Sequence, residues 1–147
     1  MSLIFLSHTE KDFPVSEELA RGLEEAGYST WYYERDTIPG MSYLLQITRA
    51  IESCDALVLI ASSNSITSDQ VTKEIIGAFE RSIPILPILP ILTDITPAQL
   101  KEKQPEWRHV LGGAAMTTIA PEDPSPTVSS ITEGVKARGI QPGGGST

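Results

Sequence analysis

Only a few side chains in this sequence are of types that do covalent or metal chemistry. The chain has two histidines, His8 and His109, and one cysteine, Cys54. Without a Cys-x-x-Cys pair this set does not match the usual zinc sites, so no metal is expected. Ser7 and His8 are adjacent at the end of a predicted strand, where neighbouring side chains point in different directions. A Ser-His-Asp arrangement built on them is therefore disfavoured.

Glu74 places a carboxylate where it can border a cleft. Val71, Ile75 and Phe79 recur at helical spacing and predict a helix with one buried face. On the helical wheel Glu74 falls on the flank of that face, on the same side as Gln70. The alternative is an ordinary solvated charge, because surface helices are rich in glutamate.

The common phosphate-binding loops are missing from the sequence. No Gly-rich loop ends in Lys-Ser or Lys-Thr, and the first predicted strand is followed by "SHTEKD", without the glycines of a dinucleotide-binding turn. The net charge of −8 also argues against extended contact with a nucleic-acid backbone. A nucleotide triphosphatase and a nucleic-acid-binding domain are therefore not expected.

The elements that would position these side chains alternate between strands and helices. Apolar and β-branched runs predict strands, and apolar residues at helical spacing predict helices. Strands are expected at 3–7, 28–33, 56–61, 83–92 and 114–119, and helices at about 13–26, 44–51, 71–79, 97–103 and 125–138. The prolines in "IPILPILPIL" indicate that the fourth strand is short or near an edge.

This alternation predicts an α/β fold with a five-stranded parallel sheet covered by helices on both faces, a three-layer sandwich. Ligands of such folds bind beyond the carboxyl ends of the strands. With 147 residues the chain suits one domain, expected at 1–138. The remaining "GIQPGGGST", 139–147, is typical of a flexible linker or tail.

The sequence predicts neither a membrane span nor a disulfide. No apolar run approaches eighteen residues, and no basic segment precedes an apolar one at the start of the chain. The single cysteine cannot form an internal disulfide, which fits a reducing compartment. A cytoplasmic location is therefore expected.

Three stretches together resemble one family. "IFLSHTEKD" resembles box 1 of Toll/interleukin-1 receptor (TIR) domains of the bacterial type, and "GYSTWYYERDTIPG" resembles their box 2. "ALVLIASSNSITSDQVTKEI" resembles the third strand, the following Ser-rich loop and the helix that carries the enzymatic glutamate. The resemblance covers roughly residues 3–92, in the order and spacing of the family.

The resemblance implies a flavodoxin-like fold and one of two functions. Some TIR domains cleave the nicotinamide–ribose bond of NAD⁺, giving ADP-ribose or a cyclic isomer, and bacterial members often serve in antiphage defence or immune signalling. Others are interaction modules that assemble with further TIR domains. The position of Glu74 favours the enzyme, with NAD⁺ as substrate and no cofactor. One departure is Gln70, where many bacterial relatives have an aromatic residue.

The resemblance also implies which residues meet the substrate. Glu74 would be catalytic, and the loop 34–40 would border the cleft and contact a neighbouring TIR domain in a homo-oligomer or filament. The residues expected to contact the substrate are Ser7, His8, Arg35, Asp36, Ser62, Ser63 and Gln70. Nothing in the sequence distinguishes hydrolysis from cyclisation.

Overall fold

The computed structural model describes residues 2–81, 88–103, 117–119 and 123–142, and every structural statement below refers to these. Their strands form one parallel five-stranded sheet in the order β2-β1-β3-β4-β5. The strands are β1 (Leu3–Ser7), β2 (Ser29–Trp31), β3 (Ala56–Ala61), β4 (Ile88–Leu92) and β5 (Thr117–Thr118). The predicted α/β fold with a parallel sheet is confirmed.

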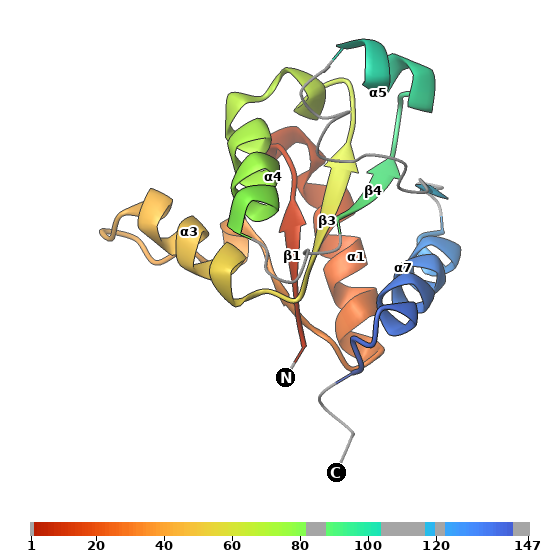
Figure 1. Ribbon diagram of the computed structural model, residues 1–147, viewed down its shortest axis with the longest axis horizontal. Coiled ribbons are helices and arrows are strands. Elements are labelled where there is room, and N and C mark those ends of the chain that lie inside the picture. The colour runs from red at the N-terminus through yellow and green to blue at the C-terminus, as the bar shows by residue number, and fades with distance from the viewer. Residues whose placement is uncertain (1, 82–87, 104–116, 120–122, 143–147) are drawn as a thin grey trace.

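The helices cover both faces of the sheet, as Figure 1 shows. Helices α1 and α7 pack on one face, and α3 and α4 pack on the other. The helices are α1 (Phe13–Glu25), α2 (Tyr33–Asp36), α3 (Tyr43–Ser53), α4 (Asp69–Arg81), α5 (Pro97–Lys103) and α7 (Ser125–Ala137), with short 3-10 helices η1 (Glu10–Asp12) and η2 (Ser65–Thr67). None of the described helices is long and apolar enough to cross a bilayer.

The apolar strands explain why the sheet lies between two helical layers. All six residues of β3 are buried, because successive side chains of a strand alternate between faces and both faces are covered. Leu57 and Leu59 belong to the core under α3 and α4, whereas Val58 and Ile60 belong to the core under α1 and α7. Two clusters of buried side chains therefore hold the carboxyl ends of the central strands in place.

The second strand is shorter than "YSTWYY" predicts. It ends at Trp31, and the chain turns into α2 two residues later. Asp36 explains the turn, because its carboxylate accepts a hydrogen bond from the Tyr32 amide (2.9 Å) while its own amide donates to the Tyr32 carbonyl (3.1 Å). The stretch expected to be a loop therefore begins as one helical turn.

The other elements lie near their predicted positions. Strand β4 lies next to the edge strand β5, and of its residues only Ile91 and Leu92 pair with β5. This agrees with a proline-containing strand near an edge. The prolines at 84 and 87, His109 and the start of the fifth predicted strand at 114–116 lie outside the described residues.

The packed body continues beyond residue 138, where the tail was expected to begin. Ile140 packs against the core under α1 and α7, and its carbonyl accepts a hydrogen bond from the Tyr28 hydroxyl (3.0 Å). The carbonyl of Gln141 accepts another from the Ser2 hydroxyl (2.5 Å). Residues 143–147 lie outside the described part of the chain.

Candidate active site

Glu74 lies at the carboxyl edge of the sheet, in the first half of α4. Its neighbours in the helix, Val71 and Ile75, are fully buried in the core, as their spacing predicts. Glu74 itself is only 7% exposed. This contradicts the alternative of an ordinary solvated charge, since carboxylates are rarely so buried without a specific reason.

Both oxygens of the Glu74 carboxylate accept hydrogen bonds. The Ser7 hydroxyl, at the end of β1, donates to Oε1 (2.6 Å), and the Gln70 side-chain amide, one helical turn earlier, donates to Oε2 (3.0 Å). Burial raises the pKa of Glu74 above its usual range, and the bonds from Ser7 and Gln70 oppose that rise. The carboxyl group is therefore one whose ionisation depends on its immediate neighbours.

A cavity of about 500 Å³ opens beside Glu74. Its volume lies within the ~300–1,000 Å³ of typical small-molecule sites. Its lining includes His8 from the loop after β1, Glu34 from α2, Tyr43 from α3, and Gln70 and Glu74 from α4. Three of the residues predicted for the site, His8, Gln70 and Glu74, therefore line one cavity.

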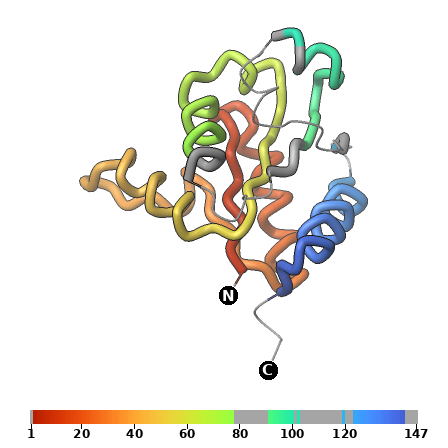
Figure 2. The backbone as a smooth tube through the Cα atoms, viewed as in Figure 1, coloured from red at the N-terminus to blue at the C-terminus, as the bar shows by residue number. Residues whose placement is uncertain are grey.

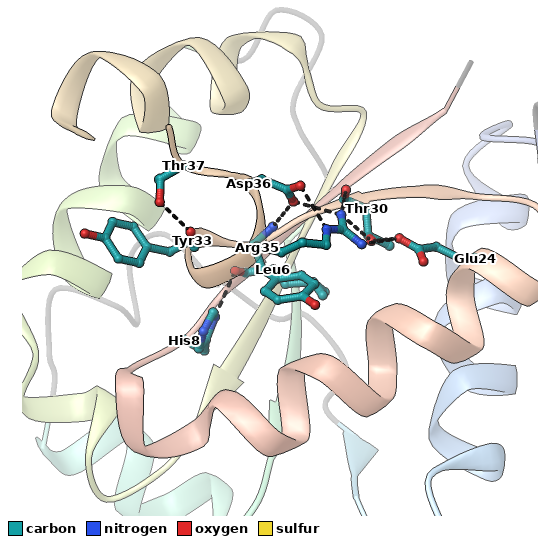
Figure 3. Close-up of polar contacts among 9 residues, drawn as sticks. Leu6, His8, Glu24, Thr30, Tyr33, Arg35, Asp36 and Thr37 are labelled. Carbon is teal, nitrogen blue, oxygen red and sulfur yellow. Dashed lines mark hydrogen bonds and ion pairs between the residues drawn. The ribbon is translucent and has the colours of Figure 1, made fainter. Parts of the chain in front are cut away.

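His8 links the end of β1 to α2. Its Nδ1 donates to the carbonyl of Leu6 (3.2 Å, Figure 3), and its Nε2 lies 2.7 Å from Oε1 of Glu34. Because a carbonyl oxygen can only accept, the Nδ1 atom carries a proton in this arrangement. His8 thus fixes one wall of the cavity and holds Glu34 towards it.

Arg35 and Asp36 do not line this cavity. Arg35 donates to Glu24 of α1 (2.5 Å), to the carbonyl of Thr30, and to both oxygens of Asp36 (2.8 Å each), as Figure 3 shows. Its guanidinium also lies 4.5 Å from the centre of the Tyr32 ring. These contacts raise the pKa of Arg35 further above its usual range, chiefly through the hydrogen bond with Asp36. The pair anchors α2 to its own domain, and its expected contact with substrate stays a prediction.

Ser62 and Ser63 follow β3 and also lie apart from the cavity lining. The Ser62 hydroxyl donates to Asp12 (2.5 Å), which is buried at the end of η1, just before α1. Ser63 donates to Asp94 through both its amide (2.9 Å) and its hydroxyl (2.5 Å). In the described residues these serines connect loops of the domain, and their expected role in substrate binding is untested.

Two aromatic residues of the cavity were not predicted from the sequence. Tyr33 and Tyr43 both line it, and their rings meet edge to face with centroids 6.3 Å apart. The signal available in the sequence was the aromatic content of box 2, in which Tyr33 ends the run "WYY". Their pairing depends on the path of the chain between α2 and α3, which the pattern of residues does not specify.

An exposed apolar surface adjoins the cavity. Its side chains are each 46–57% exposed, and we refer to them as the 33–45 apolar patch: Tyr33, Ile38, Met41, Tyr43, Leu44 and Leu45. The segment projects from the body of the molecule in Figure 2. Leu44, the first residue of the helix predicted at 44–51, belongs to this patch because α3 begins outside the core and only its later turns pack.

The patch reaches the surroundings of Glu74. Leu44 lines a second, smaller cavity of about 110 Å³, together with Gln70 and Glu74. The described residues contain no cluster of three or more histidine, cysteine, aspartate or glutamate side chains suited to a metal ion. The site is thus built from one buried carboxylate, hydrogen-bond donors and aromatic rings.

Comparison with protein families identifies the class. The model of the TIR domain family matches residues 4–116, so the chain belongs to this family. Comparison with curated protein sequences gives no match.

Solved structures show the same fold at low sequence identity. The TIR domains of the activated Roq1 resistosome, which recognises the pathogen effector XopQ, align over 92% of this chain and 99% of theirs, with 18% identity and a TM-score of 0.75. The TIR domain of the Toll-related receptor TRR-2 from Hydra magnipapillata aligns over 93% and 96%, with 18% identity and a TM-score of 0.62. A TIR-STING receptor from C. gigas aligns over 86% of this chain and 39% of its own, with 20% identity and a TM-score of 0.62.

Proposed function

We propose that this TIR domain cleaves the nicotinamide–ribose bond of NAD⁺, with Glu74 as the catalytic carboxylate. The observation that carries the proposal is the burial of Glu74 beside a cavity of about 500 Å³ that it lines. Keeping a carboxylate in such a place costs stability, and perturbed acids in clefts are concentrated at functional sites. The family includes NAD-cleaving enzymes, which supports this substrate.

One carboxylate is enough for this reaction. Glycosidases commonly use a second carboxyl group to protonate a poor leaving group. Nicotinamide in NAD⁺ is already cationic at its ring nitrogen and leaves as a neutral molecule, so no acid is required. The ribose that remains develops positive charge, which the Glu74 carboxylate stabilises. Water or the adenine ring then captures the ribose, giving ADP-ribose or a cyclic isomer, and no bound cofactor takes part.

The remaining lining suits a cationic, aromatic substrate. Glu34 brings a second carboxylate to the same cavity, which favours the positively charged nicotinamide ring. Tyr33 and Tyr43 offer aromatic faces in the cavity. We propose that the substrate stacks on these two rings. They would take the place of the aromatic side chain that the family resemblance leads us to expect at position 70.

The 33–45 apolar patch supports assembly of this domain with a second copy of the chain. Arg35 and Asp36, which lie in the loop 34–40 expected to make such contacts, are engaged within the domain, whereas the patch is unpartnered among the described residues. Six exposed apolar side chains within one short segment are typical of an interaction site. A partner seated there would lie beside Glu74, because Leu44 and Glu74 line the same small cavity.

The same patch favours the alternative function, a non-enzymatic module for TIR–TIR assembly. In either case we place the protein in immune signalling, such as bacterial antiphage defence. The Roq1 neighbour, described as a resistosome that directly recognises a pathogen effector, supports this setting by analogy of fold.

The decisive experiment is incubation of concentrated protein with NAD⁺, followed by chromatography. We expect release of nicotinamide with ADP-ribose or a cyclic isomer, and no release by Glu74→Gln, which keeps the shape of the side chain and removes its charge. Equal turnover by both proteins would exclude Glu74. If the assembled wild-type protein releases nothing, the assembly module is the function.

A further inference from the structure

Ser7 is fully buried at the end of β1, and its hydroxyl donates to Oε1 of Glu74 at 2.6 Å. The three residues before it, Ile4–Leu6, are apolar and buried. Among the residues that line the cavity Ser7 does not occur, although its neighbour His8 does. Its hydroxyl therefore meets Glu74 from the side of the core, where a substrate in the cavity does not reach.

The two oxygens of Glu74 consequently have different surroundings. Oε1 is held by Ser7 from the core, whereas Oε2 accepts from Gln70, a residue that itself lines the cavity. A ribose hydroxyl entering the cavity can take the place of the Gln70 amide at Oε2, because both are hydrogen-bond donors. The bond from Ser7 to Oε1 persists through such an exchange.

We propose that Ser7 is a positioning residue, which orients the Glu74 carboxylate and keeps it ionised so that Oε2 is presented to the ribose. The family resemblance implied that Ser7 contacts the substrate, whereas in the structure its hydroxyl is bonded to Glu74. The catalytic role of Ser7 rests on the proposed NAD⁺ cleavage. The effect of Ser7 on the ionisation of Glu74 can be tested without turnover.

The charges around Glu74 and its hydrogen bonds determine whether loss of the Ser7 hydroxyl raises or lowers the pH at which Glu74 ionises. His8 faces it from the loop after β1 and lowers its pKa, Glu34 faces it from α2 and raises it, and burial raises it most. Glu10 and the hydroxyls of Tyr33 and Tyr43 are the other titratable groups that line the larger cavity, and Lys73 lines the smaller one. The bond from Ser7 favours the ionised form, so its removal moves ionisation of Glu74 to higher pH.

The first test compares Ser7→Ala and Ser7→Cys in the full chain. A thiol is a weak donor in place of a strong one, so Ser7→Cys is expected to lie between wild type and Ser7→Ala. The acidic limb of the kcat profile should move to higher pH in that order, with KM for NAD⁺ unchanged. A raised KM with an unmoved acidic limb would show that Ser7 contacts the substrate and would overturn the proposal.

Ser16→Ala is the matched control. Ser16 is also fully buried, and its hydroxyl has no hydrogen-bond partner among the described residues. Loss of this hydroxyl should leave the acidic limb in place. A shift as large as that of Ser7→Ala would mean that any buried serine produces it, which contradicts a specific role.

The second test separates this inference from the proposed activity. Protein labelled with ¹³C at glutamate carboxyl groups is titrated by NMR, and the Glu74 signal is assigned by its loss in Glu74→Gln. A hydrogen bond to a charged group corresponds to a factor of about 10 to 100 in an ionisation constant. Ser7→Ala should lower the ionisation constant of Glu74 by this factor. An unchanged constant overturns the role of Ser7 even if the protein cleaves NAD⁺, whereas absence of NAD⁺ cleavage with the expected shift overturns only the proposed function.

Discussion

Serine hydroxyls donate to carboxylates in two regions at the carboxyl edge of the sheet, and the two regions differ in what surrounds the pair. In the first, Ser7 donates to Glu74, which lines a cavity. In the second, Ser62 and Ser63 donate to Asp12 and Asp94. None of these last residues lines the described cavity beside Glu74. The same pairing therefore serves a candidate active site in one region and a connection between loops in the other.

Burial explains the difference between Glu74, which lies beside the end of β1, and Asp94, which follows β4. Asp94 is exposed, and the bonds from Ser63 lower its pKa. Glu74 is buried, and its pKa is raised although Ser7 and Gln70 also donate to it. Hydrogen bonds thus decide the direction of the pKa shift at Asp94, whereas desolvation decides it at Glu74. A charge that is costly to maintain is the stronger indication of chemistry.

The largest expected effect is on kcat, which should depend on the charge of Glu74 but not on that of Asp94. We expect Glu74→Gln to lower kcat for NAD⁺ cleavage by at least about 10²–10³-fold, the order found when one electrostatic contact to a transition state is removed. Asp94→Asn, the matched loss of charge in the second region, should leave kcat within about threefold of wild type. Steady-state nicotinamide release measures both. Comparable losses in the two variants would mean that the region around Asp94 also takes part.

The next effect concerns the 33–45 apolar patch, which adjoins the Glu74 region. Met41 is exposed in the patch and lines neither cavity beside Glu74. Met41→Asp should weaken self-association about thirtyfold, the effect of removing roughly 2 kcal/mol of interface contact. Specific activity should fall in parallel, with light scattering as the measure of assembly.

Ser129→Asp on the exposed side of α7 is the control for this prediction, because it adds the same charge far along the sequence from the patch. It should change neither assembly nor activity. Activity per molecule that stays constant from dilute monomer upward would refute a requirement for assembly.

Gln70 offers a smaller effect within the Glu74 region. Gln70→Trp introduces the aromatic residue that the family resemblance leads us to expect at this position, and it removes the donor to Oε2 of Glu74. Stacking of a base on an aromatic ring contributes about 1–3 kcal/mol, so KM for NAD⁺ should fall about tenfold. The acidic limb of kcat should also move to higher pH, because the ionised form of Glu74 loses a hydrogen bond. An unchanged or higher KM would show that position 70 does not face the bound nucleotide.

The smallest effects are in stability, and they have opposite signs in the two regions. The pKa of Glu74 is raised above its ordinary 4.5 by folding. The contribution of protonated Glu74 to the free energy of unfolding is therefore fully present below pH 4.5 and is lost as pH rises through the folded-state pKa. Glu74→Gln avoids that loss and should raise Tm at pH 7 by about 3 °C, the order that 1 kcal/mol produces in a chain of this size. The gain should disappear below pH 4.5.

Asp94 should behave in the opposite way. Its pKa is lowered from 3.8, so its contribution to stability is present above pH 3.8 and is lost as pH falls through the folded-state value. Asp94→Asn should therefore lower Tm slightly at pH 7 and leave it unchanged in strong acid. Thermal unfolding followed by circular dichroism checks both variants, and a fall in Tm for Glu74→Gln at pH 7 would contradict the cost of burying its charge.

The sequence predicted the sheet and the position of Glu74 because both depend on local periodicity. Fully apolar runs identified β1 and β3, and the spacing of Val71 and Ile75 placed Glu74 beside the buried face of its helix. Such patterns depend on neighbours within a few turns, which a single sequence displays directly.

The partners of the polar side chains could not be predicted in the same way. Ser7 and Glu74 are 67 residues apart in the chain, and Arg35 reaches back 11 residues to Glu24. These contacts depend on how α2 and α4 pack, so the sequence did not predict the bonds by which Arg35 anchors α2. The exposure of Leu44 likewise depends on where α3 leaves the core.

The most direct test of the central claim is to locate NAD⁺ on the protein. Backbone and side-chain NMR signals of the non-cleaving Glu74→Gln variant are recorded during addition of NAD⁺. If the nucleotide binds in the cavity beside residue 74, signals of His8, Tyr43 and Gln70 should shift in proportion to occupancy. Shifts confined to Ser62, Ser63 and Asp94, or no shifts at saturating NAD⁺, would contradict the assignment of this cavity as the nucleotide site.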